Sequence, residues 1–292
     1  MADRRWVVVF VDTSILVAKV VREPAMKARI KSWLDRFQLK VSGRVALQEF
    51  KSRVLRDVAY LLYKLNQTGS YMATLNHVTN VLPRQAQRKQ RICLPLLHQV
   101  LPGGTSDQEL TERARLYLRT LLVYGQKHIE LELDALQPSI TCYWSTVAVV
   151  EKRPYSDYDF GDRKCSKSRG RCQISQDLHA RMPLCRHLLT FLQALPPERV
   201  TKELDRARTF LDKVVNGEIA RIEEEDPCLT AGDLLLALDS EPVREFYTMN
   251  YGESQAYCDA LGQNLAVRPN NPARDEEEYL ASARPWPSPS AR

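Results

Sequence analysis

Three carboxylates stand where apolar stretches of the chain meet predicted turns or helix starts. Asp12 interrupts the apolar stretch 7–21, Glu49 lies in the first turns of a long predicted helix, and Asp233 precedes the apolar run 234–238. Because an ionised carboxylate is costly to bury alone, Asp12 is expected at a strand end open to water or beside a cation. Carboxylates that converge at one end of a parallel sheet can hold one or two Mg²⁺ or Mn²⁺ ions. Such ions activate water and stabilise charge on a phosphodiester, so hydrolysis of nucleic acid is the chemistry indicated.

The residues around Asp12 predict a strand followed by a helix. The segment "WVVVFV" (6–11) is β-branched and aromatic, which is typical of a strand covered on both faces in a parallel sheet. Asp12, Thr13 and Ser14 then form a strand-to-helix turn, and turns at the carboxyl ends of parallel strands are where α/β proteins place their sites. A helix is expected over 24–38, where apolar residues recur at helical spacing.

The rest of the chain predicts mostly helices. A long amphipathic helix begins near Ser42 or Gly43 and runs to Leu65, and a short strand at 245–249 precedes Asn250. Helical periodicity also occurs around 94–100, 110–122, 184–195 and 200–222, and a last short strand is expected at 263–269. The polar residues after 269 predict a disordered tail over 270–292.

Composition sets limits on the class of protein. With 292 residues, 44% hydrophobic and 27% charged, the chain is typical of a globular protein with a substantial core. The net charge of +6 permits an anionic partner such as nucleic acid. The seven cysteines lack the spacing of a secreted disulfide scaffold, so reduced thiols and a cytoplasmic location are expected. Asp12 interrupts the apolar run that a signal peptide would need, and no run reaches the roughly 18 residues of a membrane span, so no membrane association is expected.

Four pieces of the chain, in this order, resemble the PIN domain family. They are "VVVFVDTSILV" (7–17), "VALQEFKSRVL" (45–55), "LTAGDLLLALD" (229–239) and "FYTMNYGESQAYCDALGQNLAVRP" (246–269). The resemblance implies an α/β fold, a three-layer α/β/α sandwich with a central parallel sheet, to which this chain adds a large, mostly helical insertion. The expected division is a first PIN-like part over 1–65, the insertion over 66–224, a second PIN-like part over 225–269 and the tail over 270–292.

The resemblance also implies an activity, because many members of the family are Mg²⁺- or Mn²⁺-dependent endoribonucleases and several are toxins of toxin–antitoxin pairs. Carried over by position, Asp12, Glu49 and Asp233 are the catalytic, metal-binding acids. Thr13 or Ser14 orients Asp12 or its water ligands. RNA is the expected substrate, an antitoxin or other regulatory protein is a candidate partner, and a homodimer is common in the family.

One position departs from the family pattern. The last piece usually reads Thr-x-Asp, whereas this chain has Asn250 in place of the fourth acid. An amide can ligate a metal or hold a metal-bound water but lacks the charge, so a second ion would bind more weakly. Glu253 and Asp239 are candidates to compensate. The alternative function is therefore a weakly active or inactive PIN-like protein that binds nucleic acid or serves as a protein-interaction scaffold.

Each acid also has a purely structural interpretation. Asp12 and Asp233 could simply cap the helices that they precede, and Glu49 could be an ordinary residue on a helix surface. Only their joint occurrence in the family's order and local context favours a metal site.

The region 142–187 contains a second candidate metal site. A structural zinc takes four thiolate or imidazole ligands, which Cys165, Cys172, Cys185 and His187 could supply. Their spacing differs from that of known zinc ribbons and fingers, where paired ligands are two to four residues apart. The alternative is that these are free, partly buried cysteines.

Two basic segments, one of them within this region, are candidates for nucleic-acid binding. The loop "RKCSKSRGRC" (163–172) and the cluster "RQAQRKQR" (84–91) would contact phosphates, or would simply be solvated surface. The loop residues concerned are Arg163, Lys164, Lys167, Arg169 and Arg171. Tyr155, Tyr158 and Phe160 could stack on unpaired bases or serve as core anchors.

Overall fold

A five-stranded parallel sheet lies at the centre of the described structure. The computed structural model describes residues 6–103, 106–137, 150–152, 157–159, 173–218 and 225–266. The strands of the sheet are β1 (Trp6–Val11), β2 (Phe37–Gly43), β3 (Ala135–Gln137), β6 (Glu245–Tyr247) and β7 (Asn264–Leu265). Their order is β3-β2-β1-β6-β7, and every neighbouring pair is parallel. A separate antiparallel pair is formed by β4 (Val150–Lys152) and β5 (Asp157–Asp159).

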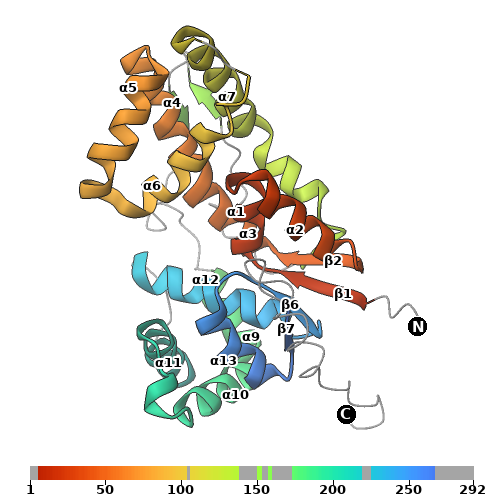
Figure 1. The fold of residues 1–292 in the computed structure, drawn as a ribbon. Coiled ribbons are helices and arrows are strands. Elements are labelled where there is room, and N and C mark those ends of the chain that lie inside the picture. Colours follow the sequence, from red (N-terminus) through yellow and green to blue (C-terminus); the bar gives the residue numbers. More distant parts are fainter. Residues whose placement is uncertain are drawn as a thin grey trace.

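Helices make up most of the remaining described residues, so the protein is of mixed α/β class. The first half contains α1 (Thr13–Val21), α2 (Pro24–Leu34), α3 (Arg44–Phe50), the π-helical segment η1 (Lys51–Leu55), α4 (Arg56–Thr68), α5 (Tyr71–Asn76), the π-helical segment η2 (His77–Val81), α6 (Leu82–His98) and α7 (Asp107–Leu131). The second half contains α9 (Gln173–Ala180), α10 (Met182–Gln193), the 3-10 turn η4 (Pro197–Arg199), α11 (Lys202–Val215), α12 (Glu225–Ser240) and α13 (Tyr251–Leu261). Figure 1 shows α4–α6 at the top, α9–α13 at the bottom, and α1–α3 between them beside β1 and β2.

The central strand β1 is buried as its apolar sequence predicts. Val9 and Phe10 have no exposed surface, and the ring of Phe10 stacks on that of Phe246 in β6 at 5.5 Å between centroids. The register pairs Val11 with Tyr247, so β1 and β6 end side by side. This pairing joins residues that are more than 230 positions apart in the chain.

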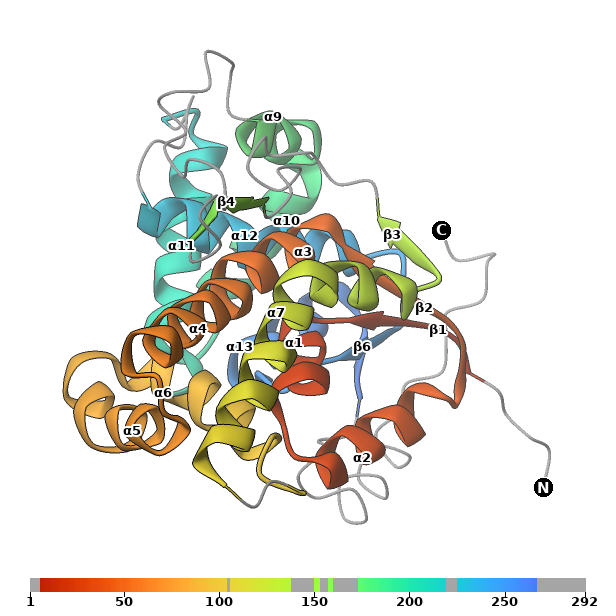
Figure 2. The same cartoon turned by 90° about the horizontal axis from the view of Figure 1, so that it is seen from above.

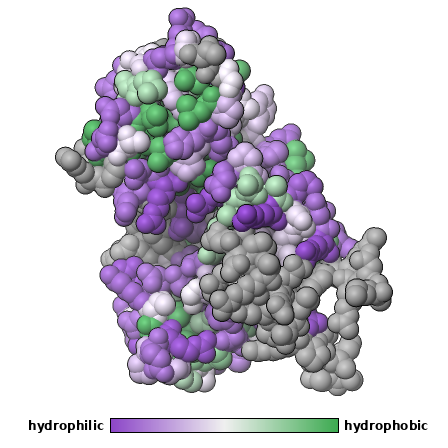
Figure 3. All heavy atoms as spheres, in the orientation of Figure 1, coloured by the Kyte–Doolittle hydropathy of each residue, from purple (hydrophilic) through white to green (hydrophobic). Residues whose placement is uncertain are grey.

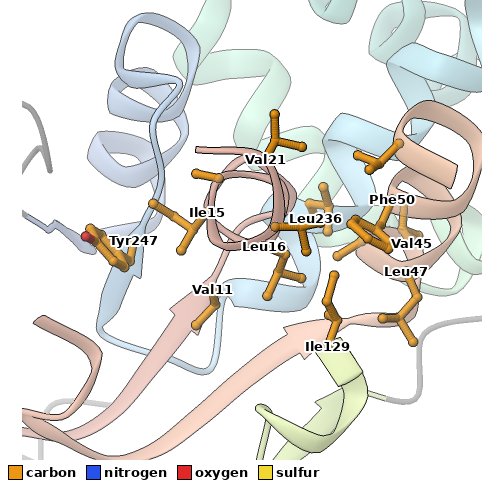
Figure 4. Close-up of a cluster of buried hydrophobic side chains, with 14 of the residues drawn as sticks. Val11, Ile15, Leu16, Val21, Val45, Leu47, Phe50, Ile129, Leu236 and Tyr247 are labelled. Atoms are coloured by element: carbon orange, nitrogen blue, oxygen red, sulfur yellow. The ribbon is translucent and has the colours of Figure 1, made fainter. Parts of the chain in front are cut away.

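The core joins both halves of the chain. Figure 4 shows Ile15 and Leu16 of α1 close to Leu236 of α12, with Phe50 of α3 and Ile129 of α7 nearby. All five side chains are almost fully buried.

The segment 66–224, expected as a helical insertion, contributes to the same core and to the same sheet. Figure 2 shows its helix α7 running alongside α4, which it contacts, and its strand β3 next to β2. The strand β3 is one edge of the sheet. The tail predicted over 270–292 lies outside the described residues.

Two expected elements differ from the structure near β2. The helix predicted over 24–38 ends at Leu34, and Phe37–Gly43 form the strand β2, which the sequence pattern did not predict. Phe37 continues the helical spacing of Trp33, but its ring packs edge-on against the Trp33 ring from a strand that is hydrogen-bonded to β1. Strand pairing has overridden a local helical pattern here.

The long helix predicted to start near Ser42 or Gly43 is confirmed in outline. It begins at Arg44, passes through η1 and continues as α4 to Thr68, three residues beyond the expected end. Gly69, in the left-handed conformation with a φ of 67°, ends it, as glycine commonly does after a helix. Within the described ranges, no helix is both long and apolar enough to span a lipid bilayer.

Candidate metal centre

The candidate site lies where the order of the strands reverses. From β1 the chain continues to β2 and β3 on one side of the sheet, whereas β6 and β7 lie on the other side. Loops that leave the carboxyl ends of two such strands diverge and create a crevice, where open α/β sheets bind ligands. Asp12 follows β1, Thr248 follows β6, and the backbone N–H of Asp12 donates to the carbonyl of Tyr247 at 3.0 Å.

The carboxylate of Asp12 is held by two hydroxyl groups. Ser14 Oγ donates to Asp12 Oδ2 at 2.6 Å, and Thr248 Oγ1 donates to the same oxygen at 2.7 Å. The backbone N–H of Ser14 also donates to Oδ2, at 3.3 Å, so Asp12 caps α1 as the structural interpretation anticipated. All of these bonds converge on Oδ2, which leaves Oδ1 as the oxygen available to a ligand.

The two hydroxyls are themselves fixed by the backbone after β6. The N–H of Met249 donates to Ser14 Oγ at 2.8 Å, and the N–H of Asn250 donates to Thr248 Oγ1 at 2.9 Å. Of the two residues expected to orient Asp12, Ser14 is the one whose hydroxyl contacts its carboxylate. Thr248 was missed as a site residue, although the threonine of the family's Thr-x-Asp pattern was a signal that could have identified it.

Four carboxylates line one cavity of about 460 Å³ beside this network. They are Asp12 at the start of α1, Glu49 of α3, Asp233 of α12 and Glu253 of α13, and Asn250 lines the same cavity. The structure therefore brings together the three acids predicted from the sequence, although they lie far apart in the chain. Because Glu253 is one of the four, it is the better placed of the two residues considered as replacements for a fourth acid.

Asp239, the other residue considered, is held elsewhere. Its carboxylate is buried and accepts a hydrogen bond from Arg181 at 2.8 Å, and it does not line the cavity. The compensation proposed for Asp239 therefore does not occur in this structure.

Glu49 is buried and is paired with a cation. Only 8% of Glu49 is exposed, so the interpretation as an ordinary surface residue is wrong. Arg53, one helical turn later, places Nη2 3.1 Å from Glu49 Oε1 and also lines the cavity. An internal cation thus accompanies the four carboxylates, because residues four apart on a helix are neighbours.

Asp233 lies within α12 rather than at its start, so it does not cap that helix. Burial raises the pKa of Asp233 to about 7, repulsion from Glu49 adds to the increase, and Arg53 partly offsets it. The pKa of Glu253 is also raised by burial, while a hydrogen bond from Asn250 lowers it. These shifts show that the carboxylates are close enough to repel one another, which is the condition that a bound cation relieves.

A buried hydroxyl adds a second sign of a ligand site. Thr13 is only 4% exposed and lines the cavity, and its Oγ1 has no hydrogen-bond partner among the residues that the structure describes. Buried polar groups usually have a hydrogen-bond partner, so this hydroxyl is a candidate to contact a ligand of the cavity. Within the same described residues, no three His, Cys, Asp or Glu side chains are grouped closely enough to hold a metal ion as they stand.

The candidate zinc ligands are not brought together by the described residues. Cys165 and Cys172 lie outside the described ranges. Cys185 is buried in α10, where its Sγ donates to the carbonyl of Leu178 at 3.4 Å, and His187 Nε2 bonds the carbonyl of Ala260 at 2.8 Å. The two described candidates therefore contact different parts of the fold, and zinc binding stays a prediction.

Most of the candidate nucleic-acid contacts also lie outside the described ranges. This applies to Arg163, Lys164, Lys167, Arg169 and Arg171, and to Tyr155 and Phe160, while Tyr158 is described only as part of the backbone of β5. In the cluster 84–91, however, Arg91 of α6 lines the cavity that holds the acids.

Comparisons of the chain with protein-family models, with curated proteins and with solved structures found no match. What the geometry defines is thus a mixed α/β protein with a parallel sheet and an acid-lined cavity at the point where its strand order reverses.

Proposed function

We propose that this protein is a PIN-like, Mg²⁺- or Mn²⁺-dependent endonuclease that hydrolyses phosphodiester bonds in single-stranded RNA. The observation that carries the proposal is the convergence of Asp12, Glu49, Asp233 and Glu253 on one cavity at the carboxyl end of a parallel sheet. Four acids from four separate elements are costly to hold together unless a cation binds between them.

The topology supports the proposed fold. The strands in chain order occupy the spatial order third, second, first, fourth and fifth, all parallel, as in doubly wound α/β sheets. The helices α2 and α12, which belong to the two separated PIN-like parts, both pack against β2. This arrangement is compatible with a three-layer sandwich built from the segments 1–65 and 225–269.

The residues present suit a divalent ion of the hard, oxygen-binding type. Asp12, Glu49 and Asp233 would hold it, with Asn250 or Glu253 contacting a water ligand. When bound, such an ion supplies a water of lowered pKa and charge stabilisation at the phosphate. The chain's own contribution is to fix Asp12 through Ser14 and Thr248 and to hold Glu49 beside the cavity through its ion pair with Arg53.

Asp12→Asn tests the proposal. The substitution preserves shape and the helix cap but removes a charge, so cleavage of a single-stranded RNA in Mn²⁺ is expected to fall at least 100-fold. Asp35→Asn is the matched control, because Asp35 is an exposed aspartate at the end of α2. The proposal fails if Asp12→Asn cleaves RNA as fast as the unaltered protein, or if neither protein shows Mn²⁺-dependent cleavage.

A second function is favoured by one feature of the cavity. The ion pair between Arg53 and Glu49 already supplies a positive charge, and Asn250 stands where the family has an acid. A protein with these features could bind RNA or a partner protein without cleaving it. It would then bind RNA equally well in EDTA and in Mn²⁺ and would release no product on long incubation.

A further inference from the structure

Three arginines line the same cavity as the acids. Arg22 follows α1, Arg53 lies in η1, and Arg91 lies in α6. Arg53 is paired with Glu49, whereas Arg22 and Arg91 are exposed and form no ion pair with an acid of the described ranges. These two exposed arginines therefore add positive charge to a cavity that is otherwise lined by acids.

Arg22 lies at a defined distance from the acidic end of the cavity. One face of α1 lines the cavity from Thr13 through Val17 and Val21 to Arg22. Arg22 follows Asp12 by ten residues, which at about 1.5 Å per residue places the two backbone positions roughly 15 Å apart along the helix axis. Along α1 the cavity therefore has Asp12 at one end and Arg22 at the other, with the apolar side chains of Val17 and Val21 between them.

The helix α6 forms another wall of this cavity. Near its middle, Cys93 Sγ donates to the carbonyl of Asp57 in α4 at 3.7 Å. Just after its end, the side-chain amide of Gln99 donates to the carbonyls of Val20 and Val21 in α1, at 3.2 Å and 3.0 Å. Arg91 is thus presented by a helix that is tied to both α4 and α1.

The surface seen from this side is largely hydrophilic. Figure 3 shows mainly hydrophilic side chains where the upper and the lower groups of helices approach each other. Arg91 and Ile92 of α6 line the cavity from one wall, and Asp233 of α12 lines it from another. The cavity of about 460 Å³ is of the size of a small-molecule site.

We propose that Arg22 and Arg91 bind backbone phosphates of one nucleic-acid strand that runs along α1 away from the acidic end. The site then takes an internal segment of a single strand, an inference that rests on the nuclease function proposed above. In a stacked strand with about 3.4 Å per nucleotide, 15 Å corresponds to roughly four nucleotides, and in an extended strand to fewer. The apolar side chains that line the cavity provide a surface for the bases of this strand. They are Val17, Val21 and Ile92.

A chemical double-mutant experiment tests this assignment. Single-stranded RNA oligonucleotides carry one neutral methylphosphonate linkage, placed one to six linkages from the cleaved bond on either side. For the unaltered protein, kcat/KM is expected to fall about tenfold when the neutral linkage is the one that contacts Arg22, two to four linkages away. For Arg22→Gln, kcat/KM is expected to be about tenfold lower on ordinary RNA and not to fall further on that oligonucleotide.

Arg91→Gln is measured in the same series, and Arg29→Gln is the matched control, because Arg29 is exposed on α2 and does not line the cavity. The assignment is overturned if Arg22→Gln and Arg91→Gln cleave every oligonucleotide as Arg29→Gln does. It is also overturned if the neutral linkage lowers kcat/KM equally at all positions.

A binding measurement separates this assignment from the nuclease function. The affinity for fluorescent single-stranded RNA is measured at several salt concentrations in EDTA, and each lost phosphate contact is expected to reduce the salt slope by about 0.7. If no protein cleaves RNA but Arg22→Gln and Arg91→Gln lower the slope, the nuclease function fails and the phosphate contacts stand. If the unaltered protein cleaves and the slopes are all equal, the phosphate contacts fail and the nuclease function stands.

Discussion

Replacing Asp233 by asparagine is expected to stabilise the metal-free protein at alkaline pH. The pKa of Asp233 is raised from its usual 3.8 to about 7, first by burial and then by repulsion from Glu49. Between these two values the folded protein keeps a proton that the unfolded chain has lost, so stability decreases as the pH rises from 4 to 7 and is constant above. The asparagine of the Asp233→Asn protein carries no charge, so that protein would not show this decrease.

The magnitude follows from the size of the pKa shift. About three pKa units at 1.36 kcal/mol each give an upper limit of roughly 4 kcal/mol for the cost of the ionised carboxylate at pH 8. About two of these pKa units lie between pH 5 and pH 7. The difference in the free energy of unfolding between the two proteins should therefore grow by up to about 3 kcal/mol over that range. Because the new amide group must also find hydrogen-bond partners, a net gain of about 1–3 kcal/mol at pH 8 is expected.

Urea unfolding of the unaltered protein and of Asp233→Asn, in EDTA at pH 5 and pH 8, measures the effect. Asp35→Asn, at an exposed position, should change stability by less than about 0.5 kcal/mol at both pH values. In saturating Mn²⁺ the unaltered protein should become more stable than Asp233→Asn at pH 8. An ion at 100 times its Kd stabilises the protein that binds it by about 2.7 kcal/mol. An Asp233→Asn protein that is no more stable at pH 8, or whose gain is the same at pH 5, would refute the raised pKa of the buried Asp233 carboxyl.

Three further outcomes are expected. Thr248→Val removes one of the two hydroxyls that hold Asp12, so kcat should fall about 10-fold or more with stability changed by less than 2 kcal/mol; unchanged kcat would exclude a positioning role. Arg181→Met takes the cation from the buried carboxylate of Asp239 and should destabilise the protein by about 3 kcal/mol in urea unfolding, with most of the loss recovered in Arg181→Met/Asp239→Asn. The affinity for Mn²⁺, measured by calorimetry, should rise by up to about tenfold per pH unit until the pH reaches the Asp233 pKa of about 7. An affinity that does not change over this range would contradict the assignment of Asp233 as a ligand.

A general rule of parallel sheets applies to Asp12. It follows a strand whose residues Val9, Phe10 and Val11 are buried, and the carboxyl ends of neighbouring parallel strands lie at one edge of a sheet. Glu49 and Asp233 were singled out because they stand at predicted helix starts and also match the family pattern, and both line the cavity. The exclusion of Asp239 was available from helical geometry, since six residues from Asp233 correspond to a rotation of about 240° to another face.

Other features depend on contacts that no local pattern encodes. The strand β2 follows Trp33 so closely that Phe37 fits the spacing of the preceding helix, and only pairing with β1 makes it part of a strand. The ion pair of Arg53 with Glu49 has the spacing of countless exposed helix pairs, and its importance comes from burial beside Asp233. The helix α6 lines the cavity because it packs near α1. Hydrogen bonds from the Gln99 side chain to α1 join residues nearly 80 positions apart, and no local sequence pattern predicts them.

The placement of β3 has a practical consequence for shortening this chain. A minimal protein made by replacing 66–224 with a short linker would lose β3 together with the bond from the N–H of Lys40 to the Asp134 carboxylate. The backbone N–H and C=O groups along the side of β2 that pairs with β3 would then face solvent and form an exposed sheet edge. Strands of other copies of the protein could pair with this edge. Such a truncated product is expected to precipitate or form fibrils, even though each of the four acids would still be present in it.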